Sequence, residues 1–144
     1  RIGLSGPSLD QGSERAAERT GCAHPSTAQV EHTLAVVAVS DIGASRSWYE
    51  RLLGEPPTNA PMPTLAEGRT TTNGWLQVFH DPERAGNSLA NLAVNDIESY
   101  VANLAARGLG HVEIVDAAKG VRLATLHDPD GNAITLIGNF RETY

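Results

Sequence analysis

The side chains in this sequence that could act as acids, bases or metal ligands are spread thinly along the chain, which has five histidines in 144 residues. Imidazole and carboxylate groups are the usual general bases and common ligands of transition metals. A histidine at a strand end is more often a solvated surface group than a ligand, so the pattern predicts no assembled catalytic site. The candidate base is His32, because alternation along a strand places it on the same face as Leu34. The remaining candidates are His80, His111, His127, Glu67 and Glu113.

Composition excludes several other classes of function. No serine or cysteine stands in a recognisable nucleophile motif, and there is no glycine-rich phosphate loop. The net charge of −6, from 11 basic and 17 acidic residues, argues against nucleic acid or an anionic membrane as the partner. No apolar run approaches the roughly 18 residues of a membrane span, and the N-terminus shows no apolar stretch after a basic start, so the pattern predicts neither membrane insertion nor secretion. Cys22, the only cysteine, has no disulfide partner, which favours a reducing cytoplasmic compartment.

The elements that must position any site begin after a polar leader. Residues 1–28 mix glycine, serine, proline and charges without an apolar period, which predicts a disordered or loosely attached segment. Residues 29–144 are expected to form a single domain. Leu34–Val39 is a continuous apolar run, which predicts a strand buried on both faces. Asp41 then caps a helix over Ile42–Leu53, which ends at Gly54.

The pattern then repeats. Leu89–Ile97 can be laid over Leu34–Ile42 at a shift of 55 residues, with 6 of the 9 positions identical. A second acidic cap and a second helix, Ile97–Arg107, follow at the matching place. The chain therefore predicts one unit of a strand, a helix and three strands used twice, over about residues 30–84 and 87–139.

Two turns introduce the last strand of each unit. Asn73-Gly74 is a hairpin signal before the strand Trp75–Phe79. In Asp128–Gly131 the proline presets φ, aspartate can close the turn and glycine accepts positive φ, which predicts a tight hairpin before the strand Ala133–Ile137. The alternating start of that final strand places Thr135 in a row facing away from the core.

The duplicated unit, the spacing from Asp41 through Trp48-Tyr49 to Gly54, and the Asp128–Asn132 hairpin resemble the vicinal oxygen chelate superfamily. This superfamily holds glyoxalase I, extradiol dioxygenases and bleomycin resistance proteins. The resemblance covers about residues 30–139 and implies an α+β fold of two tandem βαβββ modules that form half-barrels around a cavity. It also implies a homodimer.

The resemblance further implies where a metal would be held. Metal-using relatives take two ligands from the first strands, seven residues before each capping aspartate, which here are Leu34 and Leu89. They take two more from the fourth strands, where this chain has Gln77 and Thr135 in place of the usual glutamate. Leucine has no donor atom, and neutral amide and hydroxyl oxygens are weak ligands for divalent transition ions. We therefore expect no metal and no other cofactor at this site.

What remains is a cavity lined by apolar and aromatic groups with a few polar ones, which is typical of a small-molecule site. Trp75, at a strand end, could stack on a flat aromatic guest. The alternative is that the same side chains fill a closed core. The predicted ligand-binding residues are Leu34, Val36, Trp75, Gln77, Phe79, Leu89, Asn91 and Thr135.

Three functions are compatible with this pattern. The first is a metal-independent binding protein of the bleomycin resistance type, which would sequester an aromatic drug or metabolite and so confer antibiotic resistance. The second is a glyoxalase-like lyase, isomerase or dioxygenase with a relocated or absent metal, using His32 or another histidine as base. The third is an interaction protein with a filled core. We favour the first, because a site without a Lewis acid or a poised base has little with which to lower a barrier.

Overall fold

The computed structural model of the chain describes residues 29–144. The predicted leader, residues 1–28, lies outside the described residues. Contacts within the chain define a compact unit that runs from Leu34 to Tyr144. No helix among the described residues is long and apolar enough to cross a membrane.

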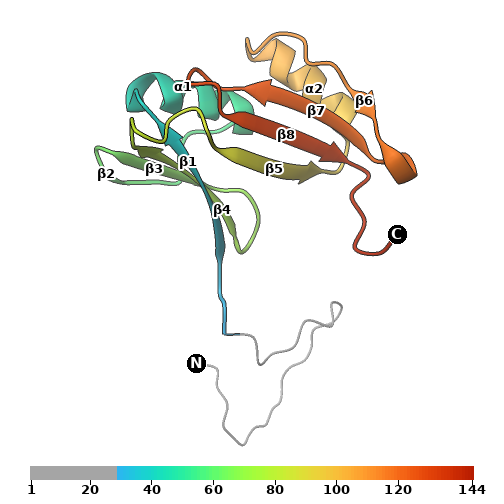
Figure 1. Cartoon of the computed structure of the whole chain (residues 1–144), viewed down its shortest axis with the longest axis horizontal. Helices are drawn as coiled ribbons and strands as arrows, with labels where there is room; N and C mark the ends of the chain where they lie inside the picture. Colours follow the sequence, from blue (N-terminus) through green and yellow to red (C-terminus); the bar gives the residue numbers. More distant parts are fainter. Residues whose placement is uncertain (1–28) are drawn as a thin grey trace, which may run out of the picture. The chain divides into compact units, whose positions relative to one another are not determined.

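The compact unit contains two four-stranded sheets, each accompanied by one long helix (Figure 1). The first sheet has the strand order β1-β4-β3-β2 and the second has the order β5-β8-β7-β6. This arrangement confirms the predicted α+β fold of two βαβββ modules. The elements of the first module are β1 (Thr33–Val39), α1 (Ile42–Leu53), β2 (Asn59–Met62), β3 (Leu65–Arg69) and β4 (Gly74–His80). Those of the second are β5 (Leu89–Val94), α2 (Ile97–Ala106), β6 (Val115–Asp116), a 3-10 turn (Ala118–Gly120), β7 (Arg122–His127) and β8 (Ala133–Gly138).

Both helices begin and end as their sequences predict. The Asp41 carboxylate accepts a hydrogen bond of 3.1 Å from the Ala44 amide, and Asp96 accepts one of 3.1 Å from Ser99. Each aspartate thus satisfies one of the amide groups that a helix start leaves without a partner. Gly54 ends α1 with φ +81°, a left-handed conformation that glycine adopts without strain.

The hydrophobic core lies on the helix side of both sheets. Buried residues of β1, β4, β7 and β8 pack with Tyr49 and Leu52 of α1 and with Val101 and Leu104 of α2. The opposite side of each sheet, which we call its open face, is not covered by a helix of its own module. The prediction that Leu34–Val39 is buried on both faces is therefore wrong. Leu34 and Val36 are 45% and 52% exposed, whereas Val37 and Val39 are fully buried.

The Asp128–Asn132 hairpin forms as predicted and joins the two modules. The Gly131 amide donates to the Asp128 carbonyl at 2.9 Å, and Gly131 has φ +93°. Asn132 is fully buried: its amide nitrogen donates to the Ala38 carbonyl at 2.8 Å, and its oxygen accepts from the Ser88 amide at 2.8 Å. The Ala38 amide in turn donates to the Ser88 hydroxyl. One asparagine therefore holds together the end of β1, the linker between the modules and the start of β8.

The predicted hairpin before Trp75 forms between β3 and β4, but Asn73-Gly74 is not a two-residue turn. Such a turn needs positive φ at both residues or at the first, but neither Asn73 nor Gly74 has one. Arg69 instead pairs with Trp75, and the amides of Thr70 and Thr71 donate to the Gly74 carbonyl. Gly74 is thus the first residue of β4, and the preceding threonines form a longer turn.

Candidate functional site

The eight predicted ligand-binding residues fall into two groups, one on the open face of each sheet. Trp75, Gln77 and Phe79 alternate along β4 with the buried Leu76 and Val78. On the second sheet, Asn91 of β5 lies opposite Thr135 of β8 in the parallel register. The first group also includes Leu34 and Val36 of β1, and the second includes Leu89 of β5.

These side chains do not fill a closed core. None of the eight belongs to the core cluster, and Phe79 and Leu89 are 36% and 84% exposed. The closed-core alternative is therefore wrong for this chain. The open faces are instead apolar surfaces available to a guest or to another protein surface.

The open face of the first sheet carries the carboxylate of Glu67, which was among the candidate acids, bases and ligands but not among the eight predicted ligand-binding residues. Glu67 of β3 pairs with Gln77 of β4, and its carboxylate accepts hydrogen bonds of 2.7 Å from Gln77 Nε2 and 3.1 Å from Asn59 Nδ2. Among the described residues, no lysine, arginine or histidine makes an ion pair with Glu67. The face thus presents a negative charge that only neutral amides stabilise. The pairing of Glu67 with Gln77 depends on a strand register that the sequence does not specify.

The indole of Trp75 is in contact with a cation. The guanidinium carbon of Arg69 lies 4.6 Å from the centre of the Trp75 ring, and Arg69 Nη1 donates to the Thr72 carbonyl at 3.2 Å. Arginine over an indole is a favourable cation–π arrangement. A guest that stacks on Trp75 must therefore use the other side of the ring or displace Arg69.

On the second sheet the polar groups are hydroxyls and an amide. The hydroxyl oxygens of Thr125 and Thr135 lie 2.9 Å apart across the antiparallel β7–β8 pair. This contact engages one hydrogen of the pair and leaves the remaining lone pairs for other donors. The surface around them is formed by Leu89 and Asn91, so it combines apolar area with a few hydrogen-bonding groups.

The four positions where metal-using relatives carry ligands do not fit a metal ion here. Leu34 and Leu89 offer no donor atom, the Gln77 amide already donates to Glu67, and Thr135 is paired with Thr125. Within residues 29–144, no group of three or more His, Cys, Asp or Glu side chains is placed to hold a metal. His32, the predicted candidate base, is exposed and precedes β1. These residues therefore do not supply the donor atoms that a metal-dependent reaction would need at these positions.

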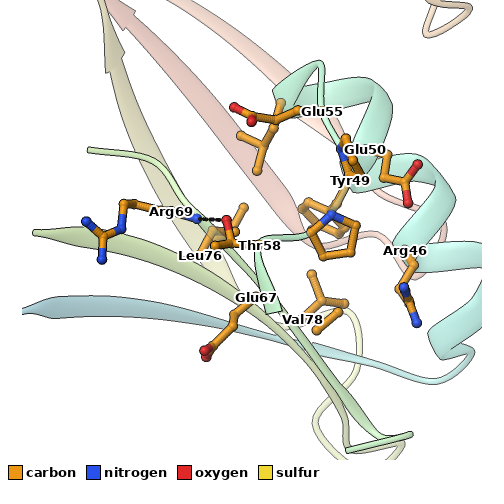
Figure 2. Close-up of a pocket in the computed structure, with 14 residues that line it drawn as sticks. Arg46, Tyr49, Glu50, Glu55, Thr58, Glu67, Arg69, Leu76 and Val78 are labelled. Atoms are coloured by element: carbon orange, nitrogen blue, oxygen red, sulfur yellow. Dashed lines mark hydrogen bonds between the residues drawn. The ribbon is translucent and has the colours of Figure 1, made fainter. Parts of the chain in front are cut away.

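A pocket also exists on the helix side of the first sheet, between α1 and strands β3 and β4 (Figure 2). Tyr49, Leu53, Leu76 and Val78 contribute to its wall, and none of the eight predicted residues lines it. Its cavity is about 30 Å³, the volume of one water molecule. Figure 2 shows the Glu67 side chain directed away from α1, consistent with its place on the open face. This pocket has no room for a small-molecule guest.

Burial and hydrogen bonding also fix the protonation of the residue that supports the hairpin. Burial, followed by the hydrogen bond to Asp128, raises the pKa of Tyr49 well above its ordinary value. The Tyr49 hydroxyl therefore stays protonated and remains a donor. Its role is structural, since it lies on the helix side of the sheet rather than on an open face.

Comparison with known proteins gives consistent results. A family model described as a glyoxalase-like domain matches residues 34–137. A glyoxalase / bleomycin resistance protein from Catenulispora acidiphila is 34% identical, with 74% of this chain and 96% of that chain covered and a TM-score of 0.70. An antibiotic binding protein from Streptomyces sp. is 25% identical, with 80% and 98% covered and a TM-score of 0.59.

A bleomycin-binding protein in complex with bleomycin is 22% identical, with 75% and 97% covered and a TM-score of 0.60, and this likeness concerns the fold alone. No curated protein sequence matches the chain. The matching family model spans most of the described residues, and the Catenulispora protein is similar over nearly its whole length. The chain therefore belongs to the glyoxalase-like domain family of the vicinal oxygen chelate superfamily.

Proposed function

We propose that this protein binds a small aromatic or apolar molecule on the open faces of its sheets, without a metal ion and without chemically changing it. The observation that carries the proposal is the composition of the first sheet's open face. Leu34, Val36, Trp75 and Phe79 are accessible there, while Gln77 offers only an amide where related enzymes use a metal ligand. Burial of a flat guest against this surface supplies affinity, and Trp75 supplies a stacking partner.

The likeness to other proteins supports the same proposal. An antibiotic binding protein from Streptomyces sp. and a bleomycin-binding protein share this fold. We propose an antibiotic or a similar secondary metabolite as the class of guest, and sequestration in the cytoplasm as the biological result. The acidic composition of the chain and the Glu67 carboxylate make a neutral or cationic guest more favourable than an anionic one.

We also propose that a second copy of the chain covers the open faces. The faces expose Leu34, Val36, Phe79 and Leu89, and exposed apolar side chains grouped on a strand face are typical of an interaction surface. A homodimer would bury these side chains and turn an open face into a walled cavity. The guest would then be held between two protein surfaces, which increases the area that it buries.

Fluorescence titration tests the binding proposal. The chain has two tryptophans, so Trp48→Phe leaves Trp75 as the only indole. We expect bleomycin or another aromatic antibiotic in a panel to quench this variant saturably, and we expect Trp75→Phe, which retains Trp48, to respond little. Absence of saturable quenching across the panel would contradict the proposal. Stoichiometric zinc, nickel, iron or manganese retained through dialysis would contradict its metal-free part.

A further inference from the structure

A second cavity lies at the edge of the second sheet, beside β7. Its volume is about 240 Å³, and it is open to solvent, since His111, Glu113, Thr125 and His127 are exposed. It is bounded by Trp48 of α1, by the segment Leu109–Glu113 that follows α2, and by Thr125–His127 of β7. None of the eight predicted residues lines it.

The cavity exists because the second sheet ends early on this side. β6 pairs with β7 only at Arg122 and Leu123. After α2, Gly108 and Gly110 both adopt positive φ, and the chain that follows them does not form a strand beside the rest of β7. Among the described elements, the β7 edge from Ala124 to His127 therefore has no strand partner on that side, and a space remains where a longer β6 would lie.

Among the polar side chains around the cavity, the Thr125 hydroxyl contacts that of Thr135, and the other three are not used by the protein itself. Within the part of the chain that the structure describes, the imidazoles of His111 and His127 and the carboxylate of Glu113 make no hydrogen bond or ion pair. The Trp48 ring packs edge-on against Tyr49, with centroids 4.7 Å apart and an interplanar angle of 72°. This contact orients the indole at the cavity wall.

The lining has one fixed charge, and it is negative. Glu113 is the only carboxylate among the lining residues, and no lysine or arginine is among them. An indole face attracts organic cations, and a carboxylate or a neutral imidazole accepts hydrogen bonds from their N–H groups. His111, Glu113 and His127 are not placed as a metal-binding group among the described residues, so a bare metal ion is not the matching ligand.

We propose that this cavity is a binding site for a compact organic cation with N–H donors, such as an amine or a guanidinium compound. Glu113 provides the counter-charge, Trp48 the aromatic contact, and His111 and His127 the additional hydrogen-bond acceptors. The site borders the open face of the second sheet through Thr125, whose hydroxyl contacts that of Thr135, and it shares no lining residue with the open face of the first sheet, where Trp75 lies.

Nuclear magnetic resonance of the full chain labelled with nitrogen-15 tests the proposal, with methylguanidinium as the probe. The two indole N–H signals report on the two sites separately. We expect a saturable shift of the Trp48 signal without a matching shift of the Trp75 signal. N-methylurea, which has a similar shape and no charge, is expected to bind about tenfold more weakly. Equal binding of both probes, or a response confined to Trp75, would overturn the proposal.

A pair of charge-matched variants identifies the counter-charge. Glu113→Gln is expected to weaken methylguanidinium binding about tenfold, a loss that corresponds to about 1.4 kcal/mol. Glu55→Gln removes the same charge from a residue at the other pocket and is expected to leave the affinity unchanged. If both variants lost methylguanidinium affinity equally, the cause would be the overall charge of the protein, and a site at Glu113 would be refuted. Absence of any saturable shift in the unmodified protein would refute it directly.

Discussion

The hydroxyl of Tyr49, on α1, donates a hydrogen bond of 2.7 Å to Oδ2 of the buried Asp128 carboxylate in the second module. Three further donors satisfy that carboxylate: the amides of Asp130 and Asn132, each at 2.9 Å, and the Asn132 side chain at 2.8 Å. A buried charge is tolerated only when it is well hydrogen-bonded. Since one of the donors to Asp128 comes from Tyr49 of α1, the conformation of the hairpin depends on the position of the first helix. The two modules are therefore coupled by polar groups as well as by the shared core.

Alkaline pH should destabilise the protein through Tyr49. Its pKa is raised above the ordinary value of 10.0 by burial and then by Asp128, so above that pH the unfolded chain loses a proton that the native chain keeps. The stability that the protonated hydroxyl provides is complete below pH 10 and decreases by about 1.4 kcal/mol per pH unit above it. Urea denaturation between pH 8 and about 11 should show this slope in the wild type and a smaller slope in Tyr49→Phe.

The same variant should also be less stable at neutral pH, by about 1–2 kcal/mol, because Asp128 loses one of its four donors. Tyr144→Phe is the matched control, since Tyr144 is exposed near the C-terminus. A wild-type slope equal to that of Tyr49→Phe would show that the Tyr49 hydroxyl titrates normally in the native state, and the account of the hairpin would then be wrong.

The linker between the modules should tolerate no side chain at Gly86. A Cβ there would lie 2.6 Å from the backbone carbonyl oxygen of Asp130, and Gly86 has φ +91°. Gly108 has the same φ but open space around it. Gly86→Ala and Gly108→Ala therefore share the backbone strain, of about 1 kcal/mol. Gly86→Ala should lose a further 1–3 kcal/mol or so to the clash with the hairpin, measured as the difference in unfolding free energy. Equal losses would mean that the linker can move away from Asp130.

Local signals in the sequence predicted most of the fold. The capping aspartates Asp41 and Asp96, the left-handed Gly54 and the Asp128–Asn132 hairpin are each determined by neighbouring residues, and all four form as expected. The repeat predicted the two modules, because the local pattern that leads from a strand into a capped helix occurs once in each. The hairpin at Asn73-Gly74 also forms, but the register of β3 on β4 gives it a longer turn than this dipeptide favours.

Features that depend on contacts between distant elements could not be predicted from the sequence. A continuous apolar strand such as β1 gives no sign of which face a helix will cover, so the exposure of Leu34 and Val36 was missed. The Glu67–Gln77 contact requires the register of two strands. The cavity beside Trp48 requires α1, the segment after α2 and β7 to meet, and these residues are up to 79 positions apart, from Trp48 to His127.

Restoring the carboxylate that relatives carry on the fourth strand should destabilise this chain. In Gln77→Glu, the new carboxylate would face Glu67, whose Oε2 now lies 2.7 Å from Gln77 Nε2. Like charges on directly opposed strand residues repel, and we expect a loss of about 1 kcal/mol at pH 7. Because protonation removes this repulsion, the loss should diminish when the pH is lowered to about 4.

Gln77→Leu separates charge from the lost hydrogen bond. It removes the same amide without adding a charge, so its effect on the unfolding free energy should be similar at both pH values. If Gln77→Glu is as stable as the wild type at pH 7, a cation from elsewhere in the chain or the solvent compensates the new charge, and the open face is less negative than proposed.

A charge on the open face should separate the proposed homodimer. Leu89 is 84% exposed in the single chain, so Leu89→Arg removes no core contact and should leave the unfolding free energy of a monomer within about 0.5 kcal/mol. In a dimer that buries this face, the guanidinium would be taken out of water without a partner, which costs several kcal/mol. Sedimentation velocity at equal protein concentration should therefore show a dimer for the wild type and a monomer for Leu89→Arg.

Phe140→Arg is the control variant. Phe140 is also exposed and apolar but lies outside the strands, so this variant should remain dimeric. A monomeric wild type would remove the second wall of the proposed site, and the guest would then have to bind to one open face alone.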